Sequence, residues 1–196
     1  MEIVPVTLEG RWVRLEPLSL QHLEALCAVG FDERIWKWNP RPPLRTTADM
    51  RQYIETALQR QAAGTALPFA TIHREAGHAV GSTRFADIDC DHRRLEIGYT
   101  WVAPAWQRTA VNTEAKYLML QHAFETLGCV RVELKTDSLN ERSRNAILRI
   151  GATQEGIFRN HMVTATGRLR HSVYFSIIDS EWPAVKARLQ EKLKRS

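Results

Sequence analysis

The sequence lacks any long apolar stretch, and no run approaches the roughly 18 consecutive apolar residues that a membrane-spanning helix needs. Its start, Met1-Glu2-Ile3-Val4-Pro5, also lacks the basic region and following apolar run of a signal peptide. We therefore expect no membrane span and a cytoplasmic protein.

Cysteine is scarce. Cys27, Cys90 and Cys129 are an odd number at wide spacings, and no CxxC pair occurs. This pattern excludes a disulfide framework and a zinc knuckle. The seven histidines form no HExxH and no other paired spacing suited to a metal. We predict small, buried or half-buried thiols and no metal.

Two nucleotide-binding motifs are missing as well. The chain contains neither the P-loop pattern GxxxxGK[ST] nor the dinucleotide fingerprint GxGxxG. These absences exclude the two commonest nucleotide-binding classes.

The remaining composition is that of an ordinary globular protein. A chain of 196 residues with 44% hydrophobic content is expected to form one domain over 1–196, with a core at about 7–178 and a C-terminal helix at about 180–194. The net charge of +5 and the pI near 9.4 favour polyanionic ligands such as nucleic acid or a phosphorylated cofactor. Because the charges are dispersed, nucleic acid is the less favoured partner. The basic cluster at 186–195 is interpreted as a solvated helix face.

Hydrophobic periodicity predicts alternating strands and helices. Ser19 and Ser180 are candidate N-caps, and the aromatic, proline-rich stretch at 36–43 is expected to be a loop. The predicted fold class is α/β with mixed α+β character, in which helices pack on a mixed sheet. Strands are expected at 11–16, 67–73, 79–87, 94–102, 130–136, 154–163 and 168–178, and helices at 19–29, 47–63, 111–127, 140–150 and 181–193.

One βαβ unit stands out, formed by strand 94–102, helix 111–127 and strand 130–136. Ligands of open sheets bind beyond the carboxyl ends of such strands, here after Val102 and after Thr136. The turn 103–114 leads from the first strand into a helix N-terminus, which is a place where unpaired amides bind phosphate. Strict alternation in the first strand predicts one face with Leu95, Ile97, Tyr99 and Trp101 and another with Glu96, Gly98, Thr100 and Val102.

Three segments together resemble a known family. The run from Arg94 to Leu118 is similar to the central motif of the GNAT N-acetyltransferases, and 137–152 and 156–176 resemble the motifs that follow it. Within that family the chain looks most like the ribosomal-protein N-terminal acetyltransferases. With the opening segment 7–17, the resemblance covers essentially the whole chain.

The resemblance implies a single-domain fold with a mixed central sheet, a splayed parallel strand pair and flanking helices. It also implies acetyl-CoA as co-substrate. Asn140 would hold the pantetheine amide, although its residue type alone equally fits a plain N-cap. Ala110 and Asn112 stand where the family usually has glycine. The pantetheine arm would pair with the backbone of Trp101, Val102 and Ala103, and the pyrophosphate would bind the turn formed by Gln107, Arg108, Thr109, Ala110, Val111, Asn112 and Thr113.

Chemistry adds two candidate catalytic residues. An amine attacks a thioester only when neutral, so a general base is useful. Glu96 is the candidate base. The alternative is that Glu96 forms a salt bridge on the strand surface with Arg94 or another neighbour. Ser143 is the candidate acid for the departing thiolate, as the resemblance suggests, because Ile147 stands where many members carry Tyr. The alternative for Ser143 is a solvent-facing or supporting role.

The leading functional hypothesis is acetyl transfer to a primary amine, either a protein N-terminal α-amine or a small molecule, by direct attack in a ternary complex. A CoA-binding regulatory module without catalysis and an RNA-binding accessory protein are the alternatives. A homodimer is left open. Phe31, Trp36 and Trp38 either line the acceptor entrance or pack a loop by themselves. His161, Arg170 and His171 are left without a role.

Overall fold

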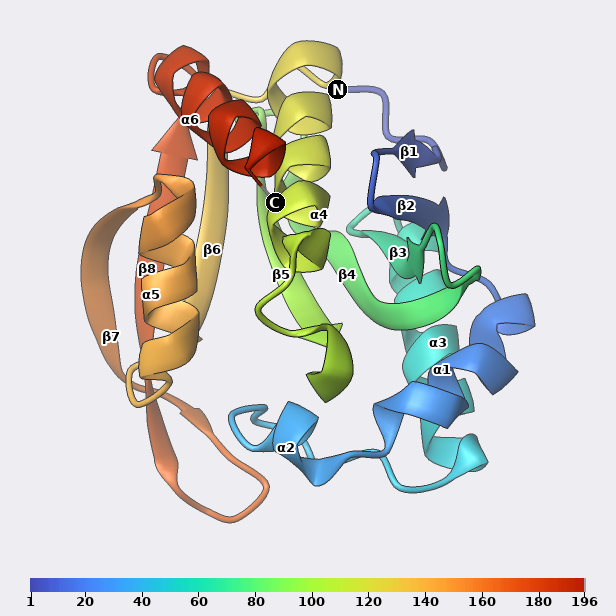
Figure 1. Ribbon diagram of the computed structural model, residues 1–196. Helices are drawn as coiled ribbons and strands as arrows, with labels where there is room; N and C mark the ends of the chain where they lie inside the picture. Colours follow the sequence, from blue (N-terminus) through green and yellow to red (C-terminus); the bar gives the residue numbers. More distant parts are fainter. Residues whose placement is uncertain (196) are drawn as a thin grey trace.

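The computed structural model describes residues 1–195 and contains one mixed sheet (Figure 1). Its strand order is β1-β2-β3-β4-β5-β6-β8-β7, and all neighbours are antiparallel except the parallel pair β5–β6. The strands are β1 Leu8–Glu9, β2 Val13–Pro17, β3 Leu67–His73, β4 His78–Asp89, β5 Arg94–Val102, β6 Arg131–Asp137, β7 Thr153–Val163 and β8 Leu169–Ile178.

Six α-helices accompany the sheet in the described chain, and five of them lie where the periodicity predicted helices. The sixth, α2, is a single turn that the sequence analysis did not predict. A π-helical turn, His122–Thr126, extends α4, and Gly128 follows with a positive φ of 68°. The helices are α1 Leu23–Gly30, α2 Glu33–Trp36, α3 Thr47–Ala62, α4 Ala110–Gln121, α5 Glu141–Ile150 and α6 Trp182–Lys194.

The two predicted serine caps have different outcomes. Ser19 is an N-cap, as predicted, but of a short 3-10 turn, Leu20–His22, that leads into α1. Its backbone N–H donates to His22 Nδ1. The prediction that Ser180 caps the last helix is wrong. The N-cap of α6 is Glu181, which makes no side-chain capping bond. The helix therefore begins one residue later than its serine suggested.

The helices cover the two faces of the sheet unequally (Figure 1). The larger hydrophobic core lies between the sheet and α4, α5 and α6. A smaller core lies between α1, α3 and strands β3 to β5. Trp36 belongs to this smaller core: it is 5% exposed, its Nε1 donates to the Gly30 carbonyl, and its ring lies 5.6 Å from that of Trp101. Trp36 is therefore packed against the strand residue Trp101, and not among the aromatic residues of its own loop as one of the two interpretations expected.

A β-bulge interrupts β5. Arg84 of β4 pairs with Gly98, but Ser82, two residues earlier on β4, pairs with Trp101, three residues later on β5. The extra residue is accommodated where Tyr99 adopts a positive φ of 53°. Such a bulge switches the facing of every residue that follows it.

The predicted strict alternation of β5 is therefore wrong beyond Gly98. Leu95 and Ile97 lie in the core beneath α4, whereas Trp101 lies in the core beneath α1 and α3. Thr100 turns toward α4, where the Nζ of Lys116 lies 2.6 Å from its hydroxyl. The bulge thus places Glu96 on the same face as Tyr99 and Trp101, and not with Thr100.

The parallel strands β5 and β6 diverge, as the resemblance implied. Their pairing is confined to the beginning of β5 and ends at Glu96, which pairs with Glu133. No strand of the described chain pairs with this edge of β5 beyond Glu96. The second half of β5 therefore offers an open backbone edge toward β6.

Within residues 1–195, no helix is both long and apolar enough to cross a bilayer. The three cysteines are free thiols: Cys129 is buried and Cys27 half-buried, as predicted, but Cys90 is exposed, so the prediction is wrong for that thiol. No cluster of three or more His, Cys, Asp or Glu side chains suited to a metal ion occurs in this part of the chain.

Candidate active site

Glu96 is buried at the point where β5 and β6 begin to diverge. It is 3% exposed, and its Oε2 lies 2.6 Å from Nζ of Lys135 on β6. The alternative partner Arg94 instead pairs with Asp89 and Glu133. Glu96 therefore forms one ion pair with the neighbouring strand, at the head of the open edge.

The environment of Glu96 favours a carboxylate that can accept a proton. Burial raises its pKa, while the charge and hydrogen bond of Lys135 oppose that rise, and the net pKa lies above the ordinary value. Burial alone would lower the pKa of Lys135, but the contact with Glu96 outweighs it and the net direction is upward. Lys135 therefore stays protonated beside the carboxylate.

Lys135 was missed by the sequence analysis. Charged residues alternate along β6 at Arg131, Glu133 and Lys135, which places all three on one face. Once Glu96 is paired in register with Glu133, the next residue of that face is Lys135. The alternation was visible in the sequence, but the strand register that makes it useful was not.

The predicted phosphate turn lies between β5 and α4. Arg108 has a positive φ of 66°, and Thr109 caps α4 by accepting the N–H of Val111 at 3.3 Å. Ala110 and Asn112 both lie in the first turn of the helix. Because the left-handed residue is Arg108, these two positions need no glycine for their backbone conformation. Thr113, one residue further, has a buried side chain.

The three residues predicted to pair with pantetheine present their backbone in different directions. The Ala103 N–H donates to the Val80 carbonyl of β4 at 2.8 Å, and the Trp101 carbonyl lies so close to Gly81 that a Cβ there would overlap it. The Val102 carbonyl instead accepts Nε2 of Gln107 at 2.8 Å. Of the three, Val102 is the residue whose carbonyl faces away from β4.

Gln107 also connects the turn to α5, since Arg142 donates to its Oε1 at 2.6 Å. Asn140 is the N-cap of α5 and accepts the N–H of Ser143 at 3.1 Å. The amide nitrogen of Asn140 is not used by this cap. Ser143 is half-buried in the first turn, whereas Ile147, one turn later, is a core residue.

Lys116 lies behind the bulge, fully enclosed. Its Nζ contacts the hydroxyls of Thr100 at 2.6 Å and Thr83 at 3.5 Å, and burial lowers its pKa to about 7 against the opposing charge of Glu96. The sequence analysis did not single it out. Its spacing three residues before Met119 places it on the buried stripe of α4, which is an unusual position for a lysine.

Arg84 of β4 is a second buried cation, and its side chain lies on the opposite face of the sheet from Lys116. It is 2% exposed, its Nε has no hydrogen-bond partner, and its guanidinium lies over the rings of Tyr53 and Tyr99 at 5.0 and 4.3 Å. Each ring contact contributes roughly 0.5–2 kcal/mol. An unpaired buried charge costs several kcal/mol, so the two rings offset only part of the cost of burying Arg84.

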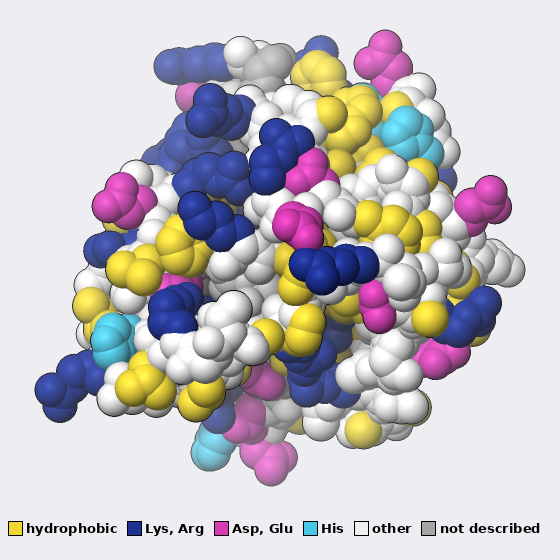
Figure 2. Space-filling view, turned by 90° about the horizontal axis from the view of Figure 1, so that it is seen from below, with side chains coloured by type: hydrophobic (Ala, Val, Ile, Leu, Met, Phe, Trp, Pro, Cys, Tyr) yellow, Lys and Arg dark blue, Asp and Glu magenta, His cyan; other side chains and the backbone are white. Residues whose placement is uncertain are grey.

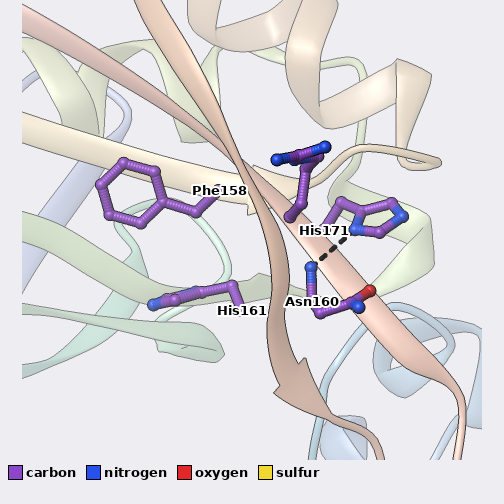
Figure 3. A pocket seen from close by; sticks show the side chains of 5 residues that line it. Phe158, Asn160, His161 and His171 are labelled. Carbon is purple, nitrogen blue, oxygen red and sulfur yellow. Dashed lines mark hydrogen bonds between the residues drawn. The ribbon is translucent and has the colours of Figure 1, made fainter.

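An open hollow lies on the β7–β8 hairpin (Figure 3). Two extra residues bulge β7 between Phe158 and Met162, and the N–H of Asn160 donates to His171 Nδ1 at 2.8 Å. In Figure 3, Phe158 and His161 point to one side of the strand and Asn160 and His171 to the other. The bulge therefore separates two groups of side chains.

The first of these groups continues toward Glu96. The rings of Phe158 and His161 lie 4.3 and 5.7 Å from that of Tyr174, and Lys135 Nζ lies 5.8 Å from the Tyr174 ring. His161 thus belongs to the sheet face that carries Glu96. Arg170 is buried close to Asp137.

Basic side chains gather on one side of the molecular surface. Seen from below, Lys and Arg side chains cluster on the side of the molecule where α5 and α6 lie, and acidic residues are interspersed elsewhere (Figure 2). Arg188 of α6 donates to the carbonyls of Leu148 and Arg149 at the end of α5. Such cations stabilise a helix C-terminus, which gives the basic C-terminal helix a structural role.

The geometry thus places a buried, paired carboxylate beside an open strand edge that leads to a helix N-terminus. In the comparison with known proteins, residues 13–153 match the family described as "Acetyltransferase (GNAT) domain". The chain belongs to the GNAT family and is an acyltransferase.

Three known proteins illustrate how similar this chain is to members of the family. "Putative ribosomal N-acetyltransferase YdaF" from Bacillus subtilis (strain 168) is 32% identical over 56% of this chain and 59% of its own. The crystal structure of a GCN5-related N-acetyltransferase from Brucella melitensis is 36% identical, with a TM-score of 0.91 over 97% of this chain and 86% of its own. Mycobacterium smegmatis RimJ in complex with CoA-disulfide shares the fold, with 21% identity and a TM-score of 0.84 over 96% and 95% of the two chains. The expected membership of the GNAT family is thereby confirmed, and YdaF is the one of these three relatives that is 30% or more identical and whose name points to the ribosomal branch.

Proposed function

We propose that the protein transfers the acetyl group of acetyl-CoA to a primary amine by direct attack in a ternary complex. The observation that carries the proposal is the open edge of β5 between the buried carboxylate of Glu96 and the N-terminus of α4. A linear cofactor with a reactive end and a phosphorylated end matches that arrangement.

The residues along this path suit the three parts of the cofactor. Unclaimed helix N-terminal amides and the cation of Arg108 suit a pyrophosphate. Val102 and the free amide nitrogen of Asn140 suit the amides of pantetheine. In this structure the side-chain amide of Gln107 donates to the Val102 carbonyl. On cofactor binding, Gln107 would release this carbonyl, which would then accept a hydrogen bond from pantetheine. A neighbour of the same fold is described in complex with CoA-disulfide, which supports the assignment.

Glu96 is proposed to accept the proton of the attacking amine, directly or through water. An amine with an ordinary pKa is largely protonated at pH 7, and its ammonium form has no lone pair for attack. A carboxylate whose pKa is raised by burial is better matched to that proton than an exposed one. Lys135 holds Glu96 in place and limits how far its pKa rises.

Ser143 is proposed to protonate the departing thiolate from the first turn of α5. The acceptor is a protein N-terminal α-amine or the amine of a small molecule, and the name of the relative YdaF favours the first. The cytoplasm, where ribosomes assemble, is the compartment that this acceptor implies.

The test begins with calorimetric titration of acetyl-CoA, 3′-dephospho-acetyl-CoA and acetyl-pantetheine. We expect micromolar binding that collapses for acetyl-pantetheine, because this fragment lacks the pyrophosphate. An amine-acceptor screen follows with Glu96→Gln and Ser143→Ala. Glu133→Gln is the matched control, since Glu133 pairs with Arg131 on the same face but takes no part in the proposed chemistry.

We expect Glu96→Gln to lower kcat by about 10²–10⁴-fold while acetyl-CoA binding persists, and Glu133→Gln to retain kcat. Absence of acetyl-CoA binding would refute the proposal. Tight binding without turnover on any amine would indicate a CoA-binding module instead.

A further inference from the structure

We infer that the acceptor carries a carboxylate, and that Arg84, with Tyr53 and Tyr99, binds this carboxylate beside Glu96. The inference rests on the proposed function and specifies its substrate class. Aspartate or glutamate at a peptide N-terminus and the α-carboxylate of a free amino acid share this chemistry.

The first argument is charge. Three arginines surround the Tyr99 ring, with the guanidinium carbons of Arg84, Arg60 and Arg41 at 4.3, 5.5 and 5.8 Å from its centroid. None of the three forms an ion pair within residues 1–195. By contrast, Arg45, close to Arg41 in the sequence, is paired with Glu33 at 2.7 Å. The cluster around Tyr99 therefore holds positive charge without a protein anion.

The second argument is burial. Arg84 is 2% exposed, and its buried Nε donates to nothing in the described chain. Buried guanidinium groups are ordinarily paired with an acid, because an unpaired donor loses its bonds to water. Its planar donor set matches a carboxylate in two parallel bonds. An anionic ligand would supply the missing partner.

The third argument is preorganisation by the two tyrosines. The Tyr53 hydroxyl donates to Ser82 Oγ at 3.2 Å, and the Tyr99 hydroxyl accepts Nη1 of Arg60 at 2.7 Å. The Tyr99 O–H proton is left free to donate to a carboxylate. Tyr99 takes a positive φ at the bulge, a conformation that costs free energy and is typical of functional sites.

The fourth argument is position. Arg84 is paired with Gly98, and the side chain of Glu96 folds over Gly98 so closely that a Cβ there would overlap its Oε1. The two functional groups therefore occupy one sheet face on either side of Gly98. A substrate with an amine close to a carboxylate can place the amine at Glu96 and the carboxylate at Arg84.

The phosphates of acetyl-CoA are not the anion concerned. Arg84 faces α3, since its guanidinium lies over Tyr53 of that helix. The predicted phosphate turn leads into α4, which covers the other face of the sheet. Arg84 instead shares its sheet face with Glu96, which is the face that an acceptor amine would have to reach.

The experiment uses the 196-residue chain and compares acceptors with and without one carboxylate. Because amidation of a carboxylate also lowers the pKa of the neighbouring amine, each kcat/KM is expressed per neutral amine. One pair is the peptide amides Asp-Ala-NH₂ and Asn-Ala-NH₂, and the second pair is alanine and alaninamide. The quantity measured is the ratio of kcat/KM within each pair. In parallel, binding of N-acetyl-aspartate and N-acetyl-asparagine to the CoA-loaded protein is measured by calorimetry, which requires no turnover.

We expect the carboxylate member of at least one pair to be preferred about tenfold or more, the range that a hydrogen bond to a charged group supports. The pair that shows the preference identifies the source of the carboxylate. Arg84→Met should bring the ratio to about one, and Arg41→Gln, which changes an exposed residue, should lower it severalfold. Arg45→Gln is the matched control and should leave the ratio unchanged.

Equal rates within both pairs, or a preference that survives Arg84→Met, would overturn the inference and leave the acetyltransferase proposal intact. Should Arg84→Met fail to fold, Arg41→Gln and Tyr99→Phe decide the question by the same ratio. Arg84-dependent binding of N-acetyl-aspartate without any turnover would keep the carboxylate site and refute acetyl transfer. The two failures are therefore distinguishable.

Discussion

Lys135 Nζ lies 2.6 Å from Glu96 Oε2, across the parallel strands just where their pairing ends. The contact holds the candidate base at the head of the open edge of β5. Lys135 moderates the rise in pKa that burial imposes on Glu96, so in the proposed reaction it positions the base and tunes its pKa.

Lys135→Met should therefore shift the pH dependence of the reaction. Without the cation, the pKa of Glu96 rises further, and the carboxylate becomes available as a base only at higher pH. We expect the acidic limb of the kcat profile to move upward by about 1–2 pH units, whereas Lys135→Arg should restore most of the original profile. An unchanged profile in Lys135→Met would mean that Glu96 is not the titrating base.

Much of this arrangement could be predicted from the sequence, because periodicity sets element type. The range of β5 was predicted without error, and the divergence of β5 and β6 followed from the resemblance. The bulge at Tyr99 could not be predicted, since an extra residue in a ladder depends on the partner strand and not on local propensity. The contacts of Arg84 with Tyr53 and Tyr99 could not be predicted either, because the three residues come from three separate elements.

Glycine at position 81 is expected to be needed for the geometry of the open edge. A Cβ on Gly81 would overlap the Trp101 carbonyl, whereas one on Gly156 meets nothing within 4 Å. Because the obstacle at Gly81 is backbone, it cannot move aside without disturbing Val102. We expect Gly81→Ala to destabilise the fold by about 1–3 kcal/mol, and Gly156→Ala by under about 0.5 kcal/mol.

Urea unfolding of the two glycine variants checks this expectation. A stability of Gly81→Ala equal to that of Gly156→Ala would show that β4 and β5 can separate locally at no cost. Acetyl-CoA affinity, measured on the same samples, should fall only for Gly81→Ala.

Glu114 should prove to be a structural carboxylate that ties α4 to the start of the chain. Its two oxygens accept the backbone N–H groups of Arg11, Trp12 and Val13 at 2.9, 2.6 and 2.8 Å. Glu114→Ala leaves three donors without a partner at a cost of about 1–3 kcal/mol for each one that stays buried. Thermal unfolding should show a loss of several kcal/mol, and the exposed turn residue Glu75 provides the control in Glu75→Ala.

Lys116 should make stability depend on pH above neutrality. Its pKa of about 7 in the folded protein lies below the roughly 10.4 of an unfolded lysine. Between these values the unfolded chain binds more protons, so the free energy of unfolding gained from this group rises with pH and is smallest below pH 7. Cys129 acts in the opposite direction, because burial raises the pKa of its thiol to about 11.

The difference between wild type and Lys116→Met isolates the lysine from the thiol. Urea unfolding of both proteins is measured at pH 7, 8 and 9. The free energy of unfolding of wild type should rise relative to that of the variant by up to about 1.4 kcal/mol per pH unit. The hydroxyls of Thr83 and Thr100 lie 2.7 Å apart, so they satisfy each other when the ammonium is removed. A difference that stays constant over this range would mean that Lys116 keeps an ordinary pKa and that the bulge is open to water.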